Sequence, residues 1–123
     1  ENILINHNWD VLRRTMWNYV GIVRNSKRLE LARQRIISIT REIESLCANH
    51  KITRNMVELR NIAQVSQLIV ESAMLRKESR GLHYTTDYPN SDSEQMYWLV
   101  LSRQPKTQSW EFTVEHHPFT RAG

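Results

Sequence analysis

Residues 27–49 read KRLELARQRIISITREIESLCAN, and this stretch decides the fold class. Its apolar side chains recur at steps of three and four, which is the spacing of one face of an α-helix. They are Leu29, Ala32, Ile36, Ile39, Ile43 and Leu46. Charged residues lie mostly between them, so the pattern predicts an amphipathic helix over residues 27–49 with one buried face. Ser26 is the candidate N-cap, because a hydroxyl can accept a hydrogen bond from the first turn.

Two more helices are predicted, one on each side of this stretch. The first covers residues 8–23, with Asn8 as candidate N-cap and an apolar stripe of Trp9, Leu12, Met16, Tyr19, Val20 and Val23. The other follows the cap residue Thr53 and runs to about Arg80, with an apolar face of Met56, Leu59, Ile62, Ala63, Ser66, Ile69, Val70 and Ala73. Residues 8–80 are therefore predicted to form a three-helix bundle, similar to a spectrin repeat.

The helical period is lost at Gly81. Glycine enters the left-handed conformation without a Cβ clash, so Gly81 is expected to end the third helix. Tyr88 must be extended because Pro89 follows it. Residues 81–94 are therefore predicted to form an extended arm.

A β-hairpin is predicted beyond the arm. Residues 96–102 have the composition of a strand, and a second strand is indicated by apolar residues that alternate with polar ones, namely Trp110, Phe112 and Val114. A turn over residues 104–108 would join the two strands into a hairpin over residues 95–117. The sequence as a whole predicts one mainly α domain over residues 1–123.

The composition is that of an ordinary globular domain, with 123 residues and a net charge of +4. The longest apolar run, residues 96–101, is far shorter than the roughly 20 residues that span a bilayer, so no membrane partner is expected. The single cysteine, Cys47, excludes an internal disulfide and is expected to be mostly buried. The first residue is Glu1, so the chain is expected to be either processed or a piece of a longer one.

The sequence offers little of the chemistry that enzymes use. Its three glycines cannot build a dinucleotide-binding fingerprint or a P-loop, both of which need several glycines near the phosphates. The histidines show no metal-ligand spacing, and Glu58, Glu71 and Glu78 are interpreted as partners of arginines rather than as general bases. No catalytic, cofactor-binding or metal-binding residue is therefore expected in this segment.

Three stretches carry a family resemblance. The segment RKESRGLHYTTDYP, residues 76–89, resembles the arm after the last helix in the succinate dehydrogenase and fumarate reductase flavoprotein family. Its GLHY and DYP are similar to the arm of the L-aspartate oxidases in particular. The segments HNW with MWNYVGIVR, residues 7–9 and 16–24, and ELRN with the following Ala63 resemble the opening and the third helix of the same carboxy-terminal domain.

The resemblance implies a role inside a larger flavoenzyme. Members of this kind bind FAD and oxidise L-aspartate to iminoaspartate, which feeds quinolinate and then de novo NAD biosynthesis, so a functional link to quinolinate synthase is also implied. The flavin would be bound by the preceding flavin-binding and capping domains, which would be the partners of this segment. The segment itself would brace them, in the cytoplasm of a bacterium or in a plastid of a plant.

The arm is the candidate docking element for those domains. Its apolar residues with polar tips lie outside any periodic element, as interface residues often do. The candidate docking residues are Arg76, Ser79, Arg80, Leu82, His83, Tyr84, Asp87 and Tyr88. The alternative is that the arm folds back over its own bundle.

Two other functions remain open at this point. The tail beyond residue 89 is closer in outline to the respiratory members, so the same domain of a succinate dehydrogenase or fumarate reductase flavoprotein is one alternative. The second is a free-standing helical module that binds nucleic acid or a protein. Its basis is two basic clusters, one of Arg24, Lys27 and Arg28 and one of Arg76, Lys77 and Arg80. The main interpretation nevertheless expects that the chain does not bind nucleic acid.

Overall fold

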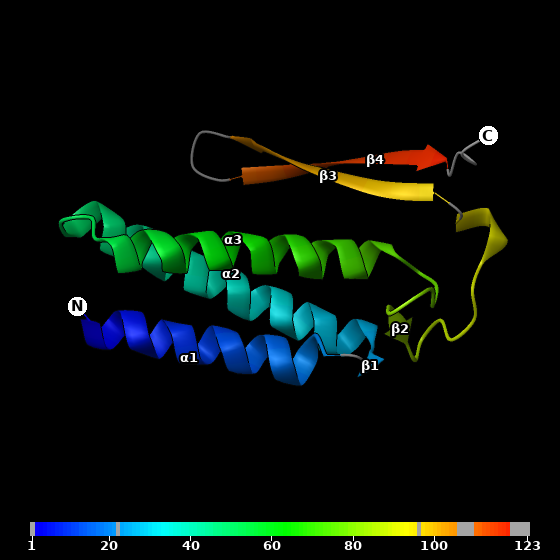
Figure 1. The fold of residues 1–123 in the computed structure, drawn as a ribbon, viewed down its shortest axis with the longest axis horizontal. Helices are drawn as coiled ribbons and strands as arrows, with labels where there is room; N and C mark the ends of the chain where they lie inside the picture. The colour runs from blue at the N-terminus through cyan, green and yellow to red at the C-terminus, as the bar shows by residue number, and fades with distance from the viewer. Residues whose placement is uncertain (1, 22, 96, 106–109, 119–123) are drawn as a thin grey trace.

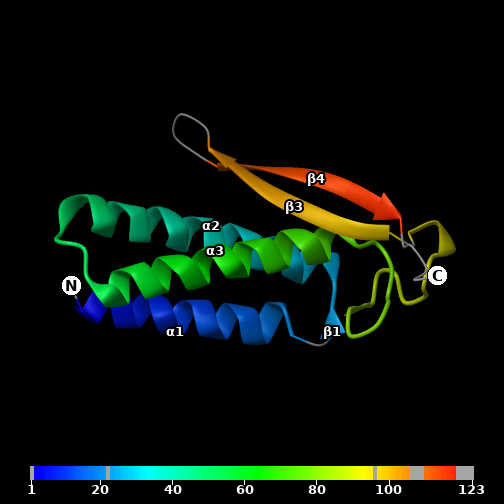
Figure 2. The same ribbon diagram turned by 45° about the horizontal axis from the view of Figure 1, so that its top comes forward.

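The computed structural model describes residues 2–21, 23–95, 97–105 and 110–118. Three long helices lie side by side, namely α1 (Asn2–Tyr19), α2 (Ser26–Asn49) and α3 (Arg54–Leu75) (Figure 1). An antiparallel hairpin of β3 (Tyr97–Pro105) and β4 (Trp110–Pro118) lies over α3 (Figure 2). The predicted fold class, a three-helix bundle followed by an arm and a hairpin, is thus confirmed.

The core lies between the three helices. Every residue of the predicted stripe on α2 is buried, from Leu29 to Leu46. The predicted face of α3 is also buried, except that Ile62 and Ile69 remain about two-fifths exposed. These two isoleucines lie at the edge of the face, where α3 approaches α1, so the apolar stripe is wider than the helix contact.

The predicted bounds of α1 were wrong. The helix begins at Asn2 rather than at Asn8 and ends at Tyr19 rather than at Val23. Asn8 is buried in mid-helix, on a face that continues back to Ile5, so its side chain cannot act as an N-cap. The buried face of this helix includes Ile5, Asn8, Leu12 and Thr15, and Val20 is buried directly after it.

The helix caps were predicted in part. Thr53 caps α3 as expected, because its hydroxyl accepts a hydrogen bond from the Met56 amide at 3.3 Å. The cap of α2 is Asn25 and not Ser26, since the Asn25 Oδ1 accepts from the Arg28 amide at 2.8 Å. Asparagine and serine cap about equally well, so the sequence alone could not separate these neighbours.

The predicted end of α3 was also wrong. The helix ends at Leu75 instead of Arg80, because Arg76 adopts an extended conformation with φ −84° and ψ 92°. Gly81 is left-handed, with φ +59°, but it lies in a separate turn that Arg80 and His83 close by exchanging backbone hydrogen bonds. The arm therefore starts several residues earlier than its sequence suggests.

The hairpin pairs its strands in a regular register, with Leu101 opposite Val114. Its first strand continues to Pro105, beyond the predicted end at residue 102, and the expected turn falls partly on residues 106–109, outside the described part of the chain. The predicted buried face of the second strand concerns side chains that are also outside the described part of the chain.

Cys47 packs against the core but is only half-buried. No described helix is long and apolar enough to cross a membrane.

Candidate functional site

The arm folds back onto the end of the bundle where α1 passes into α2 (Figure 1). Its strand β2 (Tyr84–Thr85) pairs in parallel with β1 (Val23–Arg24), the short connection between those helices. The amide of Thr86 extends the ladder by donating to the carbonyl of Arg24 at 2.8 Å. Two segments far apart in the sequence are thereby joined at one end of the molecule.

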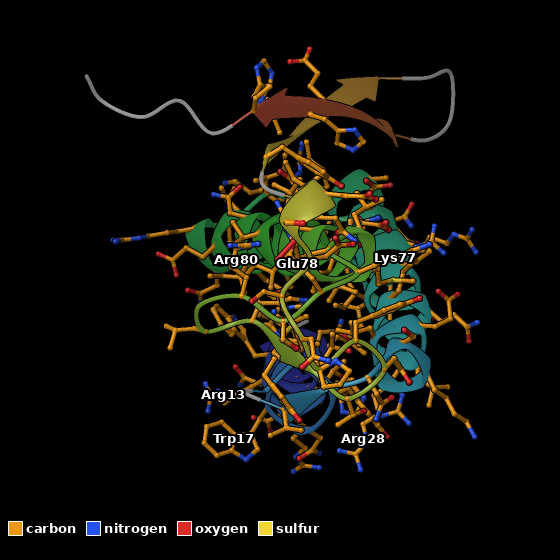
Figure 3. The ribbon with its side chains drawn as sticks, turned by 90° about the vertical axis from the view of Figure 1, so that its right-hand side faces the viewer. Arg13, Trp17, Arg28, Lys77, Glu78 and Arg80 are labelled. Carbon is orange, nitrogen blue, oxygen red and sulfur yellow. The ribbon has the colours of Figure 1, made fainter. Side chains whose placement is uncertain are left out.

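A fully buried carboxylate lies at the root of the arm (Figure 3). Glu78 has none of its surface exposed and accepts hydrogen bonds from Arg80 at 2.5 Å and from Arg76 at 3.4 Å. A buried charge is costly unless it is paired and hydrogen-bonded, and these two guanidinium groups provide that compensation. Arg76 also donates to the carbonyls of Gln95 at 2.5 Å and Tyr97 at 2.6 Å, which connects the arm to the hairpin.

Ser79 fixes the course of the arm from inside. Its buried hydroxyl accepts from the Thr85 amide at 3.1 Å and donates to the Tyr88 carbonyl at 2.7 Å. Its backbone carbonyl in turn accepts from the Ser91 hydroxyl at 2.8 Å. One small residue therefore satisfies polar groups on both sides of the turn.

His83 joins the arm to two other elements. Its Nδ1 lies 2.9 Å from Nη1 of Arg24, and its Nε2 lies 3.0 Å from the carbonyl oxygen of Arg76. A guanidinium can only donate and a carbonyl can only accept, so Nδ1 accepts and Nε2 carries the proton. Burial, followed by the neighbouring guanidinium groups of Arg24 and Arg76, lowers the pKa of His83 and favours this neutral form.

Asp87 contributes to the start of α2. Its Oδ2 accepts from the Ser26 amide at 2.6 Å, at the end of the helix where amides lack partners within the helix. A carboxylate is favourable at this position because the helix dipole is positive there. The arm thus stabilises the bundle electrostatically as well as by strand pairing.

The predicted docking residues fall into two groups. Arg76, Ser79, Arg80, His83 and Asp87 are brought together in contacts within the chain, as the alternative of an arm folded onto its own bundle requires. The remaining three keep exposed surface: Leu82 is 93% exposed, and Tyr84 and Tyr88 are each 41% exposed.

Two cavities lie beside Arg24, and neither was predicted. One of about 520 Å³ lies between α1 and α3, and one of about 480 Å³ lies between α3, the arm and β3. Both are lined by Arg24 and Ile69. The only sequence signals were the place of Arg24 in a basic cluster and the width of the apolar stripe on α3.

The remaining charged candidates have ordinary structural roles. Glu58 pairs with Arg54 at 3.1 Å and Glu71 pairs with Arg33 at 2.6 Å, as expected. His117 contacts Glu115 at 2.8 Å on the exposed part of β4. Within residues 2–21, 23–95, 97–105 and 110–118, no group of three or more histidine, cysteine or acidic side chains could hold a metal ion.

Comparison with known proteins places the chain among flavoproteins. The family described as fumarate reductase flavoprotein C-term matches residues 9–122, and therefore includes the hairpin. The L-aspartate oxidase of Pseudomonas aeruginosa is 56% identical over 90 residues, which are 73% of this chain and 17% of that protein. The L-aspartate oxidase of Yersinia pestis is 58% identical over 90 residues, again 73% of this chain and 17% of that protein.

A plant relative matches more of the chain at lower identity. The chloroplastic L-aspartate oxidase 2-b of Nicotiana tabacum is 39% identical over 110 residues, which are 85% of this chain and 17% of that protein. The chain therefore spans about a sixth of the length of the curated relatives that it matches.

Proposed function

The chain belongs to the fumarate reductase flavoprotein C-terminal family, and from this premise we propose that it is the carboxy-terminal helical domain of an FAD-dependent L-aspartate oxidase. The observation that carries the proposal is its 56–58% identity, over 73% of the chain, to two bacterial L-aspartate oxidases. The parent enzyme would oxidise L-aspartate to iminoaspartate, the first step towards quinolinate and NAD. Quinolinate synthase would then consume the product.

The residues of this chain do not fit a flavin site. The pyrophosphate of FAD needs backbone amides in a glycine-rich loop at the start of a helix, and Gly21, Gly81 and Gly123 are widely separated. The asparagine and threonine caps of α2 and α3 satisfy their own first turns. FAD would therefore be held by the flavin-binding and capping domains of the parent chain, and residues 1–123 would form one domain that braces them.

The structure also bears on the alternatives. In the basic cluster at the end of α3, Arg76 and Arg80 are occupied by Glu78 and by backbone carbonyls, which leaves few cations there for the phosphates of a nucleic acid. A respiratory flavoprotein would share the family, but the relatives named above are L-aspartate oxidases. The parent enzyme would act in the bacterial cytoplasm, or in the chloroplast if it is a plant protein.

The test is the activity of the full-length enzyme that ends in this chain. The purified protein is expected to be yellow and to oxidise L-aspartate in preference to succinate, with peroxide formation or fumarate reduction as the readout. The 123-residue chain purified alone is expected to be colourless. Preferential oxidation of succinate would identify a respiratory member instead. Stoichiometric flavin on the isolated chain would show that this segment has a flavin site after all.

A further inference from the structure

Arg24 carries its charge where the two cavities meet. Arg24 donates from Nε to the Gly21 carbonyl at 3.1 Å and from Nη1 to His83 at 2.9 Å, and both acceptors are neutral. Among the residues that the structure describes, no carboxylate pairs with it, although Glu30, Glu58, Glu71 and Glu78 all pair with other arginines. Burial lowers the pKa of Arg24, so this charge is partly removed from water without compensation within the described structure.

The walls around this cation are mostly apolar and are open. Trp17 on α1 is 83% exposed and lines the larger cavity, and Figure 3 shows it on the outer side of α1, well away from Glu78. On α3, Ile62, Val65 and Ile69 line one or both cavities and are all at least two-fifths exposed. A cluster of exposed apolar side chains beside a cavity is typical of an interaction surface rather than of free solvent-facing helix.

We propose that the groove between α1 and α3, defined by Trp17, Arg24, Ile62 and Ile69 and called the α1–α3 groove below, binds an apolar segment that carries an aspartate or glutamate. The segment belongs to the flavin-binding part of the same polypeptide, and its carboxylate pairs with Arg24. This inference rests on the proposed function, because most of the length of the relatives lies outside this chain. The positive charge of Arg24 argues for a carboxylate on the docking segment. The apolar walls argue for apolar residues on either side of that carboxylate.

Other occupants fit the groove less well. No acidic side chain lines either cavity, so a second copy of the chain docked face to face would bring two Arg24 groups together without a counter-charge. A nucleic acid would need several cations along its backbone, whereas the groove is lined mainly by apolar side chains. A segment of the parent chain needs only one carboxylate and a few apolar side chains.

Cysteine labelling in the full-length enzyme tests the proposal. Ile69 and Val57 both lie on α3 and are both 41% exposed here, but Val57 lines neither cavity. In the folded enzyme, the thiol of Ile69→Cys should react with a maleimide at least about tenfold more slowly than that of Val57→Cys. The two sites are distinguished by peptide mass spectrometry and should react alike after denaturation. Equal rates in the folded enzyme overturn the proposal.

The charge of Arg24 is tested in the same background. Arg24→Gln should speed labelling at position 69 relative to position 57 several-fold, and Arg24→Lys should restore much of the protection because it keeps the charge. Arg41→Gln, at an exposed position on α2, is the control and should change neither rate. If Arg24→Gln accelerates both positions equally, Arg24 only holds the domain together and the carboxylate contact is wrong.

Activity measured on the same preparations distinguishes a failure of the docking proposal from a failure of the proposed function. If the enzyme oxidises L-aspartate but is labelled equally at both positions, the proposed function is supported and docking in the α1–α3 groove is contradicted. If the enzyme is protected at position 69 but does not oxidise L-aspartate, docking in the groove is supported and the proposed activity is contradicted.

Discussion

His83 owes its role to a single protonation state. It accepts from Arg24 at Nδ1 and donates to the Arg76 carbonyl from Nε2, an arrangement that the imidazolium cannot make because both of its nitrogens donate. Protonation would place two N–H groups opposite each other at the end of the bundle. The contact between the arm and Arg24 is therefore sensitive to pH.

Because of His83, the free energy of unfolding should decrease as the pH is lowered. Because the pKa of His83 is lowered in the folded chain, the unfolded chain takes up a proton first as the pH falls. The stabilisation that neutral His83 contributes is complete above the pKa of histidine in the unfolded chain, about 6.5. It is lost as the pH falls from there towards the lower pKa of the folded chain. Thermal melts at a series of pH values should show this loss, and His83→Gln should flatten it.

His7→Gln is the matched control for this experiment, because His7 lies on an exposed face of α1. Its melting temperatures should follow the pH dependence of the unsubstituted chain. An unchanged pH profile in His83→Gln would mean that His83 does not determine the acid sensitivity of the domain.

Glu78 and Glu58 offer a second comparison between single residues. Glu78→Gln leaves two guanidinium groups without their buried counter-charge and should destabilise the chain by about 3 kcal/mol, the low end for breaking a buried pair. The low end applies because Arg80 keeps 32% of its side chain exposed. Glu58→Gln removes a surface pair whose side chains are 89% and 50% exposed, and should cost less than about 1 kcal/mol. Urea denaturation measures both, and equal costs would contradict the burial argument.

At the scale of the elements, Arg76 is a link between the hairpin and the bundle. Its guanidinium donates to the Tyr97 carbonyl at 2.6 Å and lies over the Tyr97 ring, 4.9 Å from the centroid. Figure 2 shows the hairpin crossing the outer surface of α3, whereas the buried core belongs to the helices. The bundle should therefore tolerate the loss of the hairpin better than the loss of any helix.

A chain that ends at residue 95 should keep its helices. Its circular dichroism at 222 nm per chain should be nearly unchanged, and its unfolding free energy should fall by about 2 kcal/mol, as for one hydrogen bond to a charged group. Glu115→Gln in the complete chain, at an exposed position of β4, is the control and should have little effect. Loss of the helical signal on truncation would show that the hairpin is needed to hold the bundle.

The elements differ in how well the sequence predicts them, for physical reasons. The face of α2 was predicted correctly because its aliphatic residues keep strict helical spacing. The start of α1 was not, because Asn8 has the chemistry of a cap, while its burial depends on packing that no local pattern encodes. The pairing of β1 with β2 was missed because strands of two residues carry no periodicity.

The candidate site shows the same division. The family resemblance selected the arm, but the local pattern assigned residues 76–80 to a helix and so treated Glu78 as a surface carboxylate. Its burial between Arg76 and Arg80 follows from the early end of α3. Arg24 was noticed only as one member of a basic cluster, since its contact with His83 joins positions 59 residues apart.

On the scale of the whole molecule, the two ends of the bundle are unequal. At one end, residues 50–53 simply connect α2 to α3. The other end holds the arm, Arg24 in the lining of both cavities, the buried Glu78 and the root of the hairpin (Figure 1). The buried ion pairs of Glu78 and the surface around Arg24 thus lie where the proposed parent enzyme would meet this domain.

The pairing of β1 with β2 also constrains the order in which the molecule can fold. Helices form from local contacts within about a microsecond, whereas Ser26 and Asp87 must meet across 61 residues, and such distant contacts are slow to form. The amide of Thr86 should therefore gain protection in pulsed hydrogen exchange after the amides in the middle of α2, and simultaneous protection would contradict this order. Arg24 and His83 would be brought together only in this late step, so the α1–α3 groove would become competent to dock after the bundle is complete.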